Sequence, residues 1–113
     1  MRCAAILALL LAALNAAPVG AASASVSIID TPRPQEKWGY APVNVRVPAG
    51  SWVTWSNSGE DAHTVTADDG SFDSGELNPS EGYSYFFTEA GTYAYVCTLH
   101  PWMTGQVIVS ADG

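Results

Sequence analysis

Apolar and polar residues alternate in short runs through most of the chain after residue 24. No stretch there has the period of about 3.6 residues that marks an amphipathic helix. Short alternating runs separated by turn-forming residues are typical of β-strands. We expect strands over 25–29, 43–47, 51–57, 62–67, 83–88, 92–97 and 105–110. About seven to eight short strands of this kind predict an all-β fold built as a two-sheet β-sandwich.

Two of the expected strands indicate which side chains face the core. In 43–47, the valines Val43, Val45 and Val47 alternate with polar residues, so we expect all three to point inward. In 51–57, Val53 and Trp55 share one face.

Two segments rich in turn-forming residues predict loops. The segment 31–42 contains three prolines, which lack the N–H that a central strand needs, and we expect Trp38 and Tyr40 from it to cover one end of the core. The segment 68–81 is rich in Asp, Ser, Gly and Asn and predicts a long loop with a brief extended piece at 71–73. The sequence shows no repeat and no linker, so we expect no second domain.

The first 24 residues have the three-part pattern of a secretory signal peptide. Arg2 precedes an apolar run, and small residues lead up to Ser25, before which we expect cleavage. A retained membrane anchor is the alternative, but a spanning helix needs about 20 apolar residues, and Asn15 and Pro18 interrupt this run. No twin arginine is present, so we expect export in the unfolded state and uptake of any cofactor outside the cytoplasm. The sequence thus predicts a signal peptide over 1–24 and a periplasmic or extracellular protein.

The expected mature domain, 25–113, is strongly acidic. It keeps three basic residues, Arg33, Lys37 and Arg46, against eleven acidic ones. A nucleic-acid-binding protein needs a basic surface to displace counterions from phosphates, and an anionic membrane would repel this domain for the same reason. We therefore expect neither nucleic acid nor a membrane as a partner. The charge favours a basic partner or simply high solubility.

The cysteine content is unusual for an exported domain of this size. Small secreted domains often depend on disulfides, yet only Cys97 remains after the signal peptide. It has no partner within the domain. A lone thiol in an oxidising compartment is expected to be either deeply buried or bound to a metal.

Four residues with soft donor atoms form the candidate metal site. Cys97, His100 and Met103 follow an expected strand with the spacing C-x2-H-x2-M, which lets one short loop direct three side chains to one point. His63 is the only other histidine, and it also lies near a strand end. After residue 24, these four are all the Cys, His and Met residues of the chain. The alternatives are a buried core cysteine, a surface histidine, a capping turn at Pro101 and a gap-filling methionine.

The donor set favours copper over other metals. Two imidazoles and a thiolate with a weak thioether are typical of blue-copper sites. Structural zinc prefers four strong donors, and a Cys-only iron–sulfur cluster is impossible with one cysteine. Four protein ligands leave no open position for a substrate, which argues against an enzyme and favours outer-sphere transfer of one electron. We expect His100, Pro101 and Trp102 to form the exit surface for the electron, although Trp102 could equally be a core residue.

These residues resemble the cupredoxins, and the C-x2-H-x2-M loop with Pro101 is most similar to the amicyanin group of that family. The likeness runs from about residue 40 to 109 and includes 50–57, the His63 segment and 87–93. The stretch 69–75 is also similar to small plastocyanin-like proteins, including halocyanins. The resemblance implies a Greek-key β-sandwich with one type 1 copper that carries single electrons between redox proteins. A c-type cytochrome is one candidate partner, and we expect a monomer.

The resemblance also implies a role for each site residue. His63, Cys97 and His100 would be the equatorial copper ligands and Met103 the axial one. The family usually has asparagine after the first histidine, where this chain has Thr64. We expect the Thr64 backbone N–H to donate toward the thiolate and its hydroxyl to reach Thr98.

Two other functions are compatible with the sequence. The domain could deliver or buffer copper for another protein, although such proteins usually expose open sites rich in Met or His. It could also be a metal-free sandwich used for binding, which would make the coincidence of four donor residues accidental.

Overall fold

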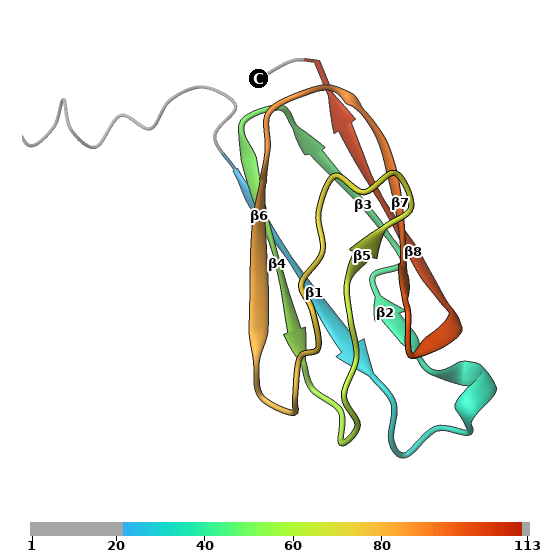
Figure 1. The fold of residues 1–113 in the computed structure, drawn as a ribbon. Helices are drawn as coiled ribbons and strands as arrows, with labels where there is room; N and C mark the ends of the chain where they lie inside the picture. The colour runs from blue at the N-terminus through green and yellow to red at the C-terminus, as the bar shows by residue number, and fades with distance from the viewer. Residues whose placement is uncertain (1–21, 112–113) are drawn as a thin grey trace, which may run out of the picture.

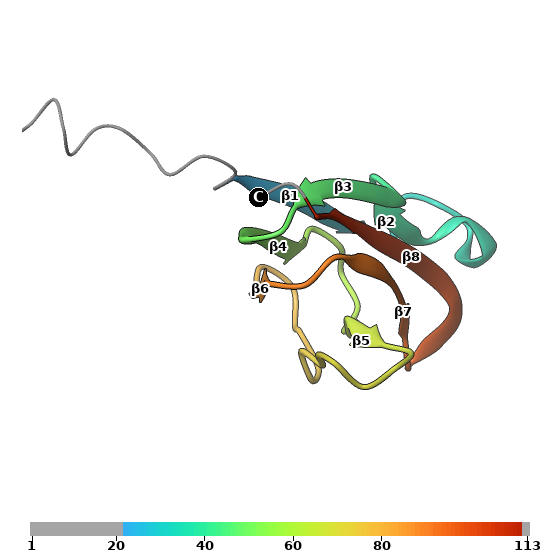
Figure 2. The same cartoon turned by 90° about the horizontal axis from the view of Figure 1, so that it is seen from above.

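The computed structural model describes residues 22–111, which form two four-stranded sheets packed face to face (Figure 1; Figure 2). The strands are β1 Ser23–Ile29, β2 Gly39–Ala41, β3 Asn44–Pro48, β4 Ser51–Asn57, β5 Thr66–Ala67, β6 Gly82–Phe87, β7 Gly91–Cys97 and β8 His100–Ser110, with one 3-10 turn, η1, at Gln35–Lys37. One sheet has the order β2-β1-β4-β6 and the other β3-β8-β7-β5. The predicted all-β, two-sheet sandwich is confirmed, with eight strands.

Both sheets are mixed. Strand β1 runs parallel to β4, and β3 runs parallel to β8, while the remaining neighbours are antiparallel. As a result, the carboxyl ends of β1 and β4 lie at the same end of the sandwich as the β7–β8 hairpin, the lower end in Figure 1. Side chains from both sheets can therefore meet there.

The core lies between the sheets and is rich in aromatic side chains. Val53 and Trp55 of β4 are fully buried, as their alternation predicted. Val45 and Val47 are also buried, but Val43 is 53% exposed, so the prediction of three inward-facing valines was wrong for Val43. The reason is that β3 begins only at Asn44, so the strand alternation does not extend to residue 43.

The segment 31–42 is not entirely a loop. It contains η1 and the short strand β2, which pairs antiparallel with β1 and places Tyr40 opposite Ile28. The prolines do not interfere with this pairing because they lie outside the three residues of β2. Trp38 and Tyr40 are both buried, as expected for residues that cover the core.

The expected strand over 62–67 is reduced to β5, Thr66–Ala67. The preceding residues bond to the long loop 68–81 instead of a strand ladder. His63 exchanges two backbone hydrogen bonds with Leu77, at 3.1 and 2.7 Å, and the Ser74 N–H donates to the Val65 carbonyl at 2.9 Å. His63 is consequently held in an irregular segment rather than in a regular strand.

The expected loop over 97–103 is much shorter in the structure. Strand β8 begins at His100, so only Thr98 and Leu99 lie between β7 and β8, and the register shifts between Val96 and Cys97. This tight connection places three candidate ligands on two adjacent antiparallel strands, Cys97 on β7 and both His100 and Met103 on β8.

The first strand begins two residues before the expected cleavage point. Ser23 and Ala24 pair with Trp52 and Val53 of β4. Residues 1–21 of the predicted signal peptide lie outside the described residues. Within 22–111, no helix has the length and apolar character needed to cross a bilayer.

Candidate metal centre

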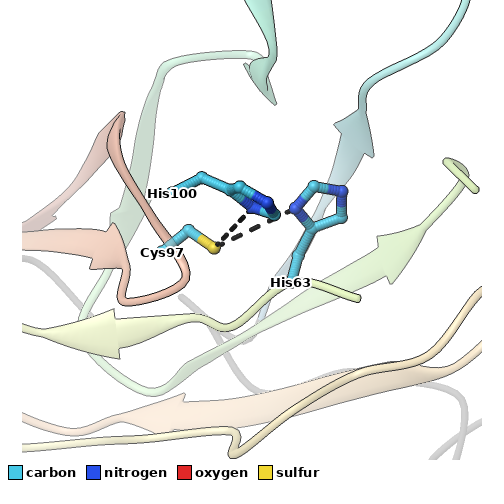
Figure 3. A group of neighbouring side chains, drawn as sticks. All are labelled: His63, Cys97 and His100. Atoms are coloured by element: carbon cyan, nitrogen blue, oxygen red, sulfur yellow. Dashed lines mark hydrogen bonds between the residues drawn. The ribbon is translucent and has the colours of Figure 1, made fainter. Parts of the chain in front are cut away.

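The side chains of His63, Cys97 and His100 converge, with their donor atoms turned toward one another (Figure 3). His63 comes from the β4–β5 connection, Cys97 is the last residue of β7 and His100 is the first of β8. Their donor atoms all lie within 4.8 Å of one another. Cys97 Sγ is 3.9 Å from His63 Nδ1 and 3.5 Å from His100 Nδ1. Both imidazoles thus present the same ring nitrogen to the sulfur.

Met103, the fourth predicted donor, lies on β8 three residues after His100 and is fully buried. Cys97 and His63 are also fully buried, whereas His100 is partly exposed. The alternation along β8 keeps Met103 on the inner face together with Val107 and Val109. Because His63 is fully buried, the alternative of a surface histidine is wrong for this residue. The burial of Cys97 likewise shields its thiol from solvent.

Hydrogen-bonding groups surround the Cys97 sulfur. Burial by itself raises the pKa of this thiol, but hydrogen bonds involving His63, the Thr64 backbone N–H and His100 outweigh it and lower the pKa to about 6. The thiolate is the form that binds metals. The geometry around Cys97 therefore favours its metal-binding form near neutral pH.

Thr64 links the two segments that carry the candidate ligands. Its backbone N–H donates to Cys97 Sγ at 3.4 Å. Its hydroxyl oxygen accepts the Thr98 backbone N–H at 2.9 Å and lies 3.3 Å from the Thr98 hydroxyl. Tyr40 adds a further restraint, because its hydroxyl donates to the Thr64 carbonyl at 2.6 Å. The contacts expected of Thr64 are present.

The segment 31–38 lies against the candidate metal site through the side chain of Trp38. Trp38 is buried with its ring edge-on to His63 and His100, at centroid distances of 6.0 and 5.2 Å. Trp102 packs against Trp38 at 6.4 Å and donates its indole N–H to the Gln35 carbonyl at 2.6 Å. Trp102 is 45% exposed, so the alternative that it is a core residue was wrong.

Two residues at this site were not recognised as such in the sequence. Asp30 is a fully buried carboxylate whose Oδ2 lies 2.7 Å from His63 Nε2. Burial by itself raises the pKa of Asp30, but hydrogen bonds from His63 and from the backbone of Asp61, Glu60 and Thr31 outweigh it and hold the pKa well below its usual range. Trp38 was expected only to cover the core. Neither residue belongs to a local motif, so only the folded contacts reveal them.

Comparisons with known proteins agree with this geometry. The model for the family described as copper binding proteins, plastocyanin/azurin family, matches residues 29–110. The chain belongs to this family. Amicyanin-alpha from Methylorubrum extorquens is 33% identical to this cupredoxin over 104 residues, covering 88% of this chain and 80% of that protein.

Solved structures give the same result. A purple cupredoxin from Nitrosopumilus maritimus has a TM-score of 0.70 and 32% identity, covering 77% of this chain and 99% of that one. A reduced Cu(I) form of an amicyanin variant has a TM-score of 0.66 and 32% identity, covering 87% of this chain and 89% of that one. The predicted resemblance to cupredoxins, and to amicyanin among them, is confirmed.

The residues present fit copper. The site brings together two imidazoles and one thiol with a buried thioether nearby on β8, as expected for a blue-copper centre. The His63 ring nitrogen that faces away from the sulfur is occupied by Asp30, which leaves Nδ1 directed toward the donor cluster. Copper is therefore the cofactor of this cupredoxin.

Proposed function

We propose that this cupredoxin is an exported carrier of single electrons, with His63, Cys97 and His100 as equatorial copper ligands and Met103 as the axial ligand. The convergence of the three donor atoms within 4.8 Å carries the proposal. Bound copper would supply the Cu(II)/Cu(I) couple. The protein would hold the ligands in one geometry for both oxidation states and exclude solvent, so that electron transfer needs little rearrangement.

The proposal extends to the protein's surroundings. The signal-peptide pattern over 1–24 supports export to the periplasm or the extracellular space. We propose redox proteins as donor and acceptor, with a c-type cytochrome as one candidate, and a monomeric carrier rather than an enzyme. The acidic composition supports partners other than nucleic acid or an anionic membrane surface.

The visible absorption spectrum of the purified protein after addition of Cu(II) tests this function. We expect an intense thiolate-to-copper charge-transfer band that bleaches with ascorbate and returns on oxidation. Only weak copper bands would mean that Cys97 is not a ligand. A mild chelator separates the carrier from a copper-delivery protein: slow loss of copper supports the carrier, and rapid loss supports delivery or buffering.

Met103→Leu tests the axial ligand. Leucine conserves the volume of this fully buried side chain, so we expect the free energy of unfolding to change by less than about 1.5 kcal/mol. The variant should bind copper and remain coloured. Loss of the axial sulfur should shift the reduction potential, because the axial ligand of a blue-copper site tunes it. An unchanged potential, measured by spectroscopic redox titration, would exclude Met103 as a ligand.

The exit surface can be tested without knowing the partner. We propose that electrons leave through His100, Pro101 and Trp102, next to the exposed Leu99. Two molecules exchanging electrons would bring these surfaces together, so Leu99→Glu should slow self-exchange by about tenfold through repulsion between like charges. NMR of mixed oxidised and reduced protein measures this rate. Phe86→Glu is the matched control, because Phe86 is also exposed but lies on β6, away from the β7–β8 hairpin. An equal effect of both variants would contradict this exit.

A further inference from the structure

A buried carboxylate lies directly behind one proposed copper ligand. Asp30 Oδ2 is 2.7 Å from His63 Nε2, and both side chains are fully buried. Asp30 follows the last residue of β1, whereas His63 lies in the β4–β5 connection, 33 residues away. The contact therefore depends on the packing of two separate segments.

The surroundings of Asp30 hold its carboxylate in one position. The backbone N–H of Glu60 donates to both carboxylate oxygens, at 2.9 and 3.0 Å, and that of Asp61 donates to Oδ2 at 3.0 Å. The Thr31 N–H donates to Oδ1. All of these groups are donors, so they favour an anionic acceptor.

Gly59 supplies the space for this carboxylate. A Cβ added at residue 59 would collide with both oxygens and with Cγ of Asp30. Glycine at this position therefore lets the β4–β5 connection close over Asp30. The pair Asp30–His63 is thus enclosed on the side away from the metal site.

We propose that Asp30 is a positioning residue for copper, which keeps His63 protonated at Nε2 and directs Nδ1 toward the metal. A carboxylate on the outer nitrogen of a metal-binding imidazole fixes the tautomer and the ring orientation and makes the ligand more basic. Its buried negative charge also stabilises Cu(II) more than Cu(I), because the interaction scales with the charge of the ion. Asp30 would therefore lower the reduction potential. This inference rests on the proposed copper site.

Asp30→Asn tests the inference, because asparagine keeps the shape and removes the charge. At a fixed ambient potential, we expect the ratio of Cu(I) to Cu(II) to rise by about tenfold or more, equivalent to about 59 mV for one electron. Spectroscopic redox titration measures this ratio. The blue absorption band should remain, which shows that the site is still assembled.

Glu60→Gln is the matched control. Glu60 is an exposed residue of the same connection, and replacing it removes one negative charge without removing the backbone N–H that Asp30 accepts. Solvent screens exposed charges, so the ratio should change by less than about twofold. An equal shift in Glu60→Gln and Asp30→Asn would overturn the specific role of Asp30.

A second variant tests the contact between Asp30 and His63 without changing either residue. Gly59→Ala should displace the carboxylate from His63 and raise the Cu(I) fraction in the same direction. It remains decisive if Asp30→Asn fails to fold. Nitrogen NMR of the Cu(I) protein adds a measurement that does not depend on the stability of the fold. In the wild type, the His63 ring proton should reside on Nε2 and exchange slowly with solvent. In Asp30→Asn, this proton should exchange faster.

The outcomes separate the two proposals. A raised potential in both variants, with slow exchange only in the wild type, supports the role of Asp30. An unchanged potential in a folded, blue Asp30→Asn protein overturns it. A wild-type protein without the blue band contradicts the copper-carrier function itself.

Discussion

Cys97→Ser is expected to remove the intense blue absorption completely. The band requires charge transfer from a sulfur to Cu(II), and Cys97 supplies the only thiol in the described residues, with its Sγ 3.9 Å from His63 Nδ1. A serine hydroxyl is a far weaker ligand, so copper affinity should fall as well. The visible spectrum and a copper-binding titration measure both effects.

The matched control for Cys97→Ser is Leu99→Ala. Leu99 lies in the same two-residue connection but is exposed and offers no donor atom. This variant should keep the colour and the copper affinity. Circular dichroism of the metal-free proteins checks that both variants are folded. Retention of the band in Cys97→Ser would exclude Cys97 as the thiolate ligand.

Trp55→Ala should cause the largest loss of stability. Trp55 is fully buried and its ring contacts those of Tyr95, Phe72 and Tyr83 at centroid distances of 5.4, 5.8 and 5.9 Å. Truncation of a buried aromatic residue lowers the free energy of unfolding by about 3–5 kcal/mol, out of a total of about 5–15 kcal/mol. Urea denaturation of the metal-free protein measures the loss without a contribution from copper binding.

Trp52→Ala is the control on the same strand. Trp52 is 50% exposed and packs mainly against Phe86, its partner on β6, at a centroid distance of 5.1 Å. Such a cross-strand pair contributes about 0.2–1 kcal/mol, so the loss should be correspondingly small. Equal losses for both tryptophans would contradict the assignment of Trp55 to the core and Trp52 to the surface.

Much of the fold was predictable because strand alternation is a local property. The range of β4 was predicted without error, and β6 and β7 differ by one residue at their ends. Strand β2 was missed because it forms through a long-range pairing with β1. Its three residues are too few to show strand alternation in the sequence. The expected strand over 62–67 was too long because its backbone hydrogen bonds go to the loop 68–81, which sequence periodicity cannot show.

The sequence by itself determined the chemistry of the site. Cys97, His100 and Met103 lie within seven residues, and His63 followed because no other histidine exists. Residue type sets donor softness, so the sequence alone was enough to favour copper.

The tertiary structure decided what surrounds those donors. It placed Asp30 behind His63, brought Trp38 against both imidazoles and left Trp102 exposed beside His100. These contacts join residues that are far apart in the chain, and they depend on how β1, the β4–β5 connection and the β7–β8 hairpin pack at one end of the sandwich. Local sequence patterns carry no information on such packing, because it is set by the balance of interactions over the whole core.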